Sequence, residues 1–271
     1  MKRILCPTDF SDIAHNAIAF AAKLAQRTAA ELVLLNVQSV FDLTPVDMIR
    51  GKALTIEALA RQLEAQSMEV SKAFKISCYS EIQPVASSLA KNIASAAREY
   101  DLLVMGTNGA DDYYQAVFGS NAYHVVRQSS IPVLLVPLEC SFTEIKQIIY
   151  AFDYLKDGKL PFRQLLPWVK NLQSEICVLD VMVESFSARA EDERIMMQEQ
   201  LKALYEDEVA LRFDTIRSAD VIESINRYML KTNADMLALC THHHGLLQLF
   251  HKSVIRAISS MARYPVFVFH E

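Results

Sequence analysis

The stretch Leu102-Leu103-Val104-Met105-Gly106-Thr107-Asn108-Gly109 carries a short apolar run directly into a loop with two glycines. After nine further residues, Gly119-Ser120-Asn121 opens a segment in which Ala122, Val125 and Val126 recur at helical spacing. A buried strand, a glycine-bearing loop and a helix in this order are typical of α/β proteins. In such proteins the ligand lies at the carboxyl end of a parallel sheet.

Three of the six glycines in the chain, Gly106, Gly109 and Gly119, belong to this one loop. Glycine lets the backbone approach a phosphate without a Cβ clash, and the free N–H groups at a helix start favour negative charge. Ser120 adds a hydroxyl donor, and Asn121 can donate through its side chain or main chain. The loop therefore predicts an anion site. The alternative is that these glycines only shape a tight turn and a helix cap.

The same alternation of short apolar runs and helical patterns extends on both sides of the loop. Runs expected to form strands occupy residues 4–6, 32–37, 76–82, 102–105 and 131–136. One helical pattern begins after Ser11 and Asp12, which can cap a helix. A second contains Ile56, Leu59 and Leu63, and a third contains Leu89 and Ile93. A further apolar stripe, expected in the core, consists of Met196, Met197, Leu201 and Leu204. Strands alternating with helices predict a mostly parallel sheet with right-handed crossovers.

The order of elements restarts in the second half of the chain. Residues 148–153 (IIYAFD) resemble residues 4–9 (ILCPTD), and residues 176–183 resemble the second strand. Residues 236–239 and 264–269 likewise match the fourth and the closing runs. Four matches in the same order indicate an internal duplication. We therefore expect two tandem domains, residues 1–140 and 145–271, joined by a short linker near residues 139–144.

The second copy lacks the glycine loop. It has Cys240-Thr241-His242-His243-His244 in place of residues 106–110, and Lys252-Ser253 in place of Gly119-Ser120. Asp153 still matches Asp9, but we expect an intact phosphate loop in the first copy alone. His242, His243, His244 and His251 suggest a metal site, although adjacent histidines cannot readily face one ion from a regular backbone. We expect solvated loop histidines and no metal.

The composition excludes several classes of protein. The formal net charge is −5 and the sequence pI is about 5.8, with no basic block, which argues against nucleic acid or an anionic membrane as partner. No apolar run approaches the roughly 20 residues of a membrane helix. The five cysteines form no C-x-x-C pair, so we interpret them as reduced thiols of a cytoplasmic protein.

These motifs resemble the universal stress protein family, over the whole chain as two copies and most strongly in residues 1–138. The family's ATP-binding members carry G-x2-G-x9-G-[S/T] after the fourth strand, which Gly106, Gly109, Gly119 and Ser120 match. The segment Pro7-Thr8-Asp9 is similar to the family's opening, where the aspartate lies near base and ribose. Val37 matches the valine whose backbone contacts adenine.

The resemblance implies two doubly wound domains, each with a five-stranded parallel sheet in the order 3-2-1-4-5 and helices on both faces. It implies ATP, or ADP or AMP, as the ligand, with magnesium as an open possibility because Asp111 and Asp112 stand where many relatives carry basic residues. The residues expected to bind the nucleotide are Pro7, Thr8, Asp9, Val37, Met105, Gly106, Gly109, Gly119, Ser120 and Asn121. We expect no catalytic residue.

Family members commonly pair through the fifth strand, so we expect residues 133–136 to pair with residues 266–269 in an intramolecular pseudo-dimer. A further homodimer stays open. The expected function is a nucleotide-responsive switch or sensor in the stress response. The alternatives are slow ATP hydrolysis and a structural or chaperone-like role with vestigial sites. The sequence lacks the S-G-G-x-D-S, H-x-G-H and G-x-S-x-G motifs of related enzymes.

Overall fold

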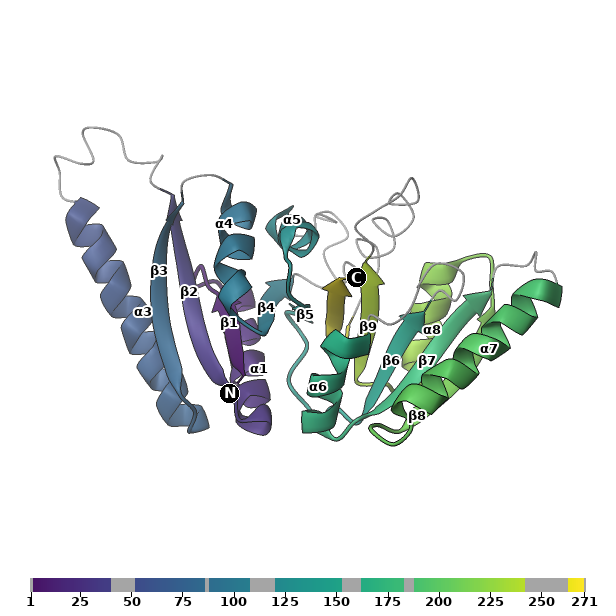
Figure 1. Cartoon of the computed structure of the whole chain (residues 1–271). Helices are drawn as coiled ribbons and strands as arrows, with labels where there is room; N and C mark the ends of the chain where they lie inside the picture. Colours follow the sequence, from purple (N-terminus) through teal and green to yellow (C-terminus); the bar gives the residue numbers. More distant parts are fainter. Residues whose placement is uncertain are drawn as a thin grey trace. The chain divides into compact units, whose positions relative to one another are not determined.

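The chain forms two compact units, Met1–Phe142 and Thr143–Glu271. The computed structural model describes residues 2–39, 52–85, 88–107, 120–152, 162–182, 188–241 and 263–270. The division between the units falls inside the segment 139–144. Both units consist of strands that alternate with helices along the chain (Figure 1).

The first unit is a doubly wound parallel sheet. Its elements are β1 (Arg3–Pro7), α1 (Asp12–Thr28), β2 (Glu31–Ser39), α3 (Lys52–Phe74), β3 (Cys78–Val85), α4 (Leu89–Ala96), the 3-10 helix η1 (Ala97–Glu99), β4 (Leu102–Thr107), α5 (Ser120–Gln128) and β5 (Val133–Pro137). Strand β1 pairs with β2 and β4, β2 with β3, and β4 with β5, all in parallel. The resulting order β3-β2-β1-β4-β5 confirms the expected 3-2-1-4-5.

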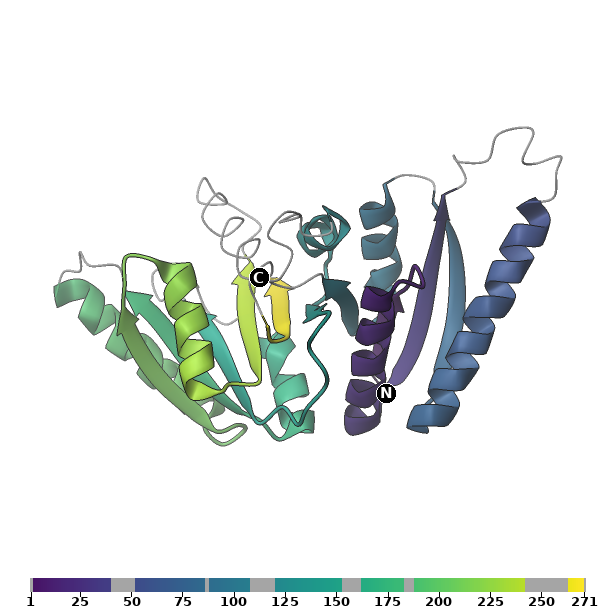
Figure 2. The same ribbon diagram turned by 180° about the vertical axis from the view of Figure 1, so that it is seen from behind.

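Helices cover both faces of this sheet. Helix α1 contacts β1, β2, β4 and β5 and also touches α3, whereas α4 touches α5 (Figure 1 and Figure 2). Right-handed crossovers account for this division, because the chain moves one way along the sheet from β1 to β3 and the other way from β3 to β5.

The second unit repeats the plan. Its elements are β6 (Gln147–Phe152), α6 (Phe162–Leu172), β7 (Glu175–Met182), α7 (Ala188–Tyr205), β8 (Leu211–Arg217), α8 (Val221–Thr232), β9 (Met236–Thr241) and β10 (Val266–His270). Strand β6 pairs with β7 and β9, β7 with β8, and β9 with β10, again in parallel. The strand order within this unit, β8-β7-β6-β9-β10, is therefore also 3-2-1-4-5.

The duplication extends to single hydrogen bonds. In the first unit, the Asp101 carboxylate accepts from the Arg3 backbone N–H at 2.7 Å, and the Asp101 N–H donates to the Arg3 carbonyl at 2.9 Å. In the second unit, Asp235 accepts from the Gln147 N–H and donates its own to the Gln147 carbonyl, both at 2.9 Å. One aspartate in each unit thus ties the start of the fourth strand to the start of the first.

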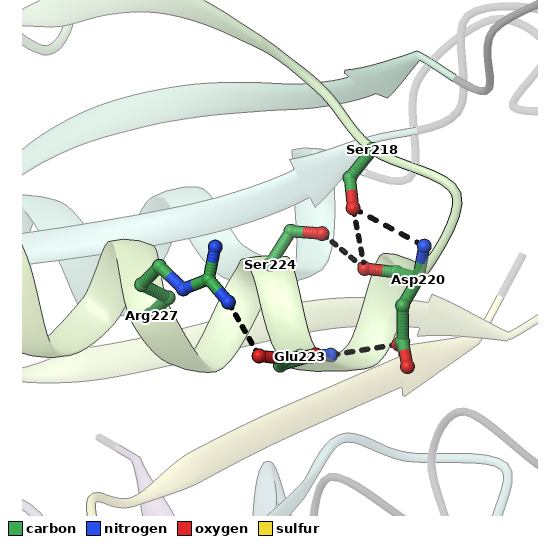
Figure 3. A network of polar contacts seen from close by, with 5 residues as sticks. All are labelled: Ser218, Asp220, Glu223, Ser224 and Arg227. Atoms are coloured by element: carbon green, nitrogen blue, oxygen red, sulfur yellow. Dashed lines mark hydrogen bonds and ion pairs between the residues drawn. The ribbon is translucent and has the colours of Figure 1, made fainter.

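Side-chain caps determine where the helices begin. Ser11 caps α1, with its hydroxyl accepting from the Ala14 N–H at 3.3 Å. Asp220 caps α8, with its carboxylate accepting from the Glu223 N–H at 3.0 Å (Figure 3). The Ser224 hydroxyl donates to the Asp220 carbonyl in the same network. Each cap satisfies a backbone donor that the helix itself leaves unpaired.

Several expectations about the elements were wrong in detail. The closing strand of the first unit, expected from residue 131, begins at Val133. The third strand begins at Cys78 rather than residue 76, because Lys75 adopts a φ of 55° and parallel pairing starts at Leu32 with Cys78. The fourth strand continues past residue 105 to Thr107. The stripe expected in the core is only partly buried, since Leu201 is 1% exposed but Met196 is 59% and Leu204 is 54% exposed. The apolar residues of α7 are spread around the helix, so one buried face cannot hold all of them.

The sequence has no apolar run long enough for a membrane-spanning helix. Among the residues that the structure describes, none belongs to a helix that is long and apolar enough to cross a membrane.

Candidate functional site

Among the described strands of the first unit, β1 and β4 are neighbours that separate before their carboxyl ends. Strands β1 and β4 pair at Ile4 with Leu102 and at Leu5 with Leu103, although β1 continues to Pro7 and β4 to Thr107. Strand β1 stays paired with β2 as far as Pro7. The gap between β1 and β4 lies at the topological switch point, where successive strands stop being added on one side of β1 and continue on the other. Open α/β sheets bind ligands at the carboxyl ends of the strands at this point.

The turn after β1 is held in place by hydrogen bonds to β2. Thr8 is 6% exposed, and its N–H donates to the Leu35 carbonyl at 2.8 Å. The Thr8 hydroxyl accepts from the Phe10 N–H at 3.1 Å, and Phe10 has a positive φ of 65°. A non-glycine residue with that φ is uncommon and is often found at functional sites. The turn therefore presents the next residues in a fixed arrangement.

Asn36 is a residue to which the sequence interpretation gave no role. It is 4% exposed, and its amide donates to the Thr8 carbonyl at 2.7 Å, while its own side-chain oxygen accepts from Gln38 at 2.7 Å. A polar residue inside the apolar run 32–37 was the available signal. Because buried amides are costly unless they are hydrogen-bonded, Asn36 is best explained as a brace between β2 and the turn after β1.

The carboxylate of Asp9 is exposed just after the carboxyl end of β1, on the turn that leads to α1. One carboxylate oxygen accepts from the Ser11 N–H at 3.0 Å and from the Ser11 hydroxyl at 2.6 Å. Nδ1 of His15 donates to the Ser11 carbonyl at 2.8 Å. These contacts orient the Asp9 carboxylate at the start of α1, where it can accept hydrogen bonds from hydroxyl groups or coordinate a cation.

Gly106 is where α1 lies against β4. A Cβ at this position would lie 2.6 Å from both Cγ2 and the carbonyl oxygen of Ile13. The sequence interpretation assigned Gly106 to close approach of the backbone to a phosphate. Packing of the helix on the strand already requires a glycine here, whether or not a ligand binds.

Other expected site residues lie at the same edge of the sheet. Pro7 ends β1, Val37 is half-buried in β2, and Met105 is 8% exposed in β4. Helix α5 begins at Ser120, as the loop-to-helix pattern predicted. Gly109 and Gly119, the side chains of Ser120 and Asn121, and Asp111 and Asp112 lie outside the described residues.

The chain that leaves the first unit is tied to the same region. The Asn16 side chain, one turn into α1, donates to the carbonyls of Pro137 at 2.9 Å and Cys140 at 3.1 Å. The Leu138 N–H donates to the Thr107 carbonyl at 2.9 Å. The start of α1 and the end of β4 therefore both hold the segment that follows β5.

Cys6, beneath this region in β1, is not available as a nucleophile. Its side chain is fully buried, and burial raises the pKa of the thiol well above its usual value, so the thiolate is disfavoured. Cys6 therefore contributes to the packing of β1 in the core beneath the candidate site.

The second unit differs at the position of Gly106. Leu103 and Leu237 hold the same register position, since their N–H groups donate to the carbonyls of Pro132 and Pro265 at 3.0 Å. Counting three residues onward from Leu237 places the buried Cys240 where β4 has Gly106. Asp153 and residues 242–262, with the four clustered histidines and Lys252, lie outside the described residues. Within the described part of the chain, no three His, Cys, Asp or Glu side chains gather as metal ligands.

The fold and the candidate site together identify the chain as a tandem α/β protein. It has two doubly wound parallel sheets and a candidate ligand site at the switch point of the first sheet, between β1 and β4. Comparison with known families is more specific. The model of the universal stress protein family matches residues 1–137, just over half of the chain. The chain belongs to the universal stress protein family.

Individual relatives match one copy or the whole tandem. A universal stress protein of Thermus aquaticus is 31% identical over 142 residues, which cover 50% of this chain and 98% of the relative. One from Methanocaldococcus jannaschii is 24% identical over 152 residues, covering 50% and 94%. The solved structure of a universal stress protein from Archaeoglobus fulgidus matches 99% of this chain and 98% of its own, with a TM-score of 0.78 and 18% identity. That last similarity supports the tandem fold.

Proposed function

We propose that this protein binds ATP or a related adenine nucleotide in its first unit and responds to it as a switch or sensor in the stress response. The observation that carries the proposal is the oriented, exposed carboxylate of Asp9 beside the parted carboxyl ends of β1 and β4. The sequence G-x2-G-x9-G-S, which resembles that of the family's ATP-binding members, begins at Gly106 near the carboxyl end of β4.

Each part of the nucleotide has a partner of suitable chemistry. The Asp9 carboxylate accepts hydrogen bonds from the ribose hydroxyls, and the backbone of Val37 faces the adenine edge. The phosphates lie toward the loop with Gly109 and Gly119 and the start of α5, where unpaired N–H groups of the helix and its dipole favour negative charge. A magnesium ion would reduce the repulsion between a triphosphate and the carboxylates of Asp111 and Asp112.

We also propose that the fifth strands of the two units, β5 and β10, pair to form an intramolecular pseudo-dimer. Residues 133–136 are apolar and their side chains are buried. A strand of this composition with an unpaired edge would be an aggregation hazard, which pairing removes.

The proposed binding is tested most simply at Gly119. Replacing it with valine puts a branched side chain where the backbone meets the phosphates, so we expect ATP affinity to fall by more than about a hundredfold, the loss expected for two charge-assisted hydrogen bonds. The melting temperature should stay close to that of the parent. Affinity is measured by calorimetric titration of nucleotide-free protein, and melting by circular dichroism.

Gly245→Val makes the same glycine-to-valine replacement in the segment after β9 of the second copy and serves as the control, which should leave ATP affinity unchanged. If Gly119→Val bound ATP as tightly as the parent, the assignment of the loop would be wrong. Chromatography and mass spectrometry of small molecules released from the purified protein would identify the nucleotide.

A further inference from the structure

A buried hydroxyl at the end of β4 lacks a hydrogen-bond partner. Thr107 is 5% exposed, and within the described part of the chain its Oγ1 is one of the few buried side-chain oxygens without a donor or acceptor in reach. Leaving a buried hydroxyl unpaired is unfavourable, so such groups are rare in native proteins and call for an explanation, of which a bound ligand is one. A contrasting case is Thr28, also buried, whose hydroxyl donates to the Leu24 carbonyl at 2.8 Å.

The position of Thr107 relates it to the proposed phosphate region. Side chains alternate across a strand, and the Cβ direction at Gly106 points at Ile13 of α1. The side chain of Thr107 therefore lies on the opposite face of β4, the face that α5 contacts. The Thr107 backbone is held by the hydrogen bond from Leu138 and by pairing with Pro137. The hydroxyl thus has a fixed position at the carboxyl end of β4.

We infer that the Thr107 hydroxyl donates a hydrogen bond to a phosphate oxygen of the nucleotide, an inference that rests on the proposed function. A phosphate is the acceptor that fits, because β4 and α5 flank the proposed phosphate region, whereas Asp9 and Val37 lie toward the ribose and base. The hydroxyl is already shielded from bulk solvent in the folded protein, so binding gains the hydrogen bond with little further desolvation of Thr107.

The inference makes opposite predictions for stability and affinity. Thr107→Val removes a hydroxyl that has no partner in the ligand-free protein, so the melting temperature should stay the same or rise. ATP affinity should fall on the order of tenfold to a hundredfold, the loss expected for one hydrogen bond to a charged acceptor. Thr107→Ser keeps the hydroxyl and should retain most of the affinity.

Two control variants separate binding from folding. Thr28→Val breaks a satisfied buried hydrogen bond and should lower the melting temperature without changing ATP affinity. Thr241→Val makes the same replacement at the end of β9, the equivalent position of the second unit, and should leave ATP affinity unchanged. All variants are compared with the parent by calorimetric titration with ATP and magnesium and by melting of the nucleotide-free protein.

The outcomes distinguish the two claims. If the parent binds ATP and Thr107→Val binds it equally well, the role of Thr107 is refuted while the proposed function stands. If Thr107→Val melts as far below the parent as Thr28→Val does, the hydroxyl has a partner within the protein and the inference also fails. If the parent itself does not bind an adenine nucleotide, the proposed function fails, and the role of Thr107 with it.

Discussion

Gly106 shows how one residue without a side chain positions both a helix and a candidate site. The contacts that a Cβ would make with Ile13 involve its carbonyl oxygen as well as its side chain, so side-chain rotation cannot relieve them all. We therefore expect Gly106→Ala to lower the free energy of unfolding by about 1–3 kcal/mol, the usual cost of overpacking. Urea denaturation of parent and variant measures this difference.

A second pair of variants isolates the backbone contact. Ile13→Ala removes the Cγ2 atom but leaves the carbonyl oxygen in place. Adding Gly106→Ala to Ile13→Ala should therefore still reduce stability. If Gly106→Ala alone were as stable as the parent, the close packing of α1 on β4 would be disproved.

Tyr100 gives a prediction about alkaline pH. It is buried and its hydroxyl donates to the Glu81 carboxylate at 2.9 Å. Burial first, and then this hydrogen bond, raise the pKa of Tyr100 to about 12. An unfolded tyrosine ionises near pH 10, so between about pH 10 and 12 the unfolded chain loses a proton that the folded protein keeps. The stability contributed by Tyr100 is therefore present below about pH 10 and is lost as the pH rises through this window.

Tyr100→Phe removes this dependence. The difference in free energy of unfolding between parent and variant should be larger at about pH 8 than at about pH 11, because only the parent carries the ionisable hydroxyl. Denaturant titrations at both pH values give the two differences. Equal differences would mean that Tyr100 does not ionise differently in the folded and unfolded states.

At the scale of elements, the sequence predicted best what depends on neighbouring residues. The apolar runs at residues 32–37 and 102–105 are strands, and Ser11 caps α1, because burial on both sheet faces and capping leave local patterns. The strand order was predicted from the family resemblance alone, and the observed pairings confirm it. Burial in α7 was predicted poorly because its apolar residues do not share one face.

The candidate site was harder to predict where it depends on contacts between distant residues. Asn36 could be noticed as polar within an apolar run, but its bond to the Thr8 carbonyl joins residues 28 positions apart. The contact of Gly106 with Ile13 likewise depends on how α1 lies on the sheet. Glycine spacing suggested a phosphate loop, whereas the packing role of its first glycine appears only in the folded chain.

The two edges of the first sheet allow a test of the proposed strand pairing. Strand β3 is one edge and pairs only with β2 among the described strands, while β5 is the other and pairs with β4. In a free edge strand, alternate backbone N–H groups point away from the sheet and exchange rapidly. If β5 pairs with β10, every amide in residues 133–136 should be protected in hydrogen exchange measured by NMR.

Strand β3 provides the internal comparison in the same experiment, since it should show alternating fast and slow amides along residues 78–85. An alternating pattern in residues 133–136 as well would argue that β5 has a free edge and that the pseudo-dimer does not form.

At the scale of the whole molecule, the chain keeps two copies of one framework, and the copies differ in sequence at the carboxyl end of the fourth strand. Asp101 and Asp235 make the same contact at the amino ends of the strands. Carboxylates on corresponding edge strands, Glu81 on β3 and Asp214 on β8, also accept from tyrosine hydroxyls, although Tyr100 precedes β4 and Tyr228 lies in α8. At the carboxyl ends the copies differ, because Cys240 has replaced Gly106.

The central claim that follows is one adenine nucleotide per chain, bound by the first unit. In the second unit, Cys240, His243 and Lys252 occupy the sequence positions of Gly106, Gly109 and Gly119. Losing a few charge-assisted hydrogen bonds of about 1.5–3 kcal/mol each weakens binding by several orders of magnitude. Lys252 could restore part of this by attracting phosphate, so the number of sites has to be measured.

Calorimetric titration of the nucleotide-free, full-length chain with ATP and magnesium measures that number most directly. We expect a single binding event with one ATP per chain, which Gly119→Val greatly weakens. Two equivalent tight sites per chain, or a parent protein that takes up no adenine nucleotide, would contradict the account.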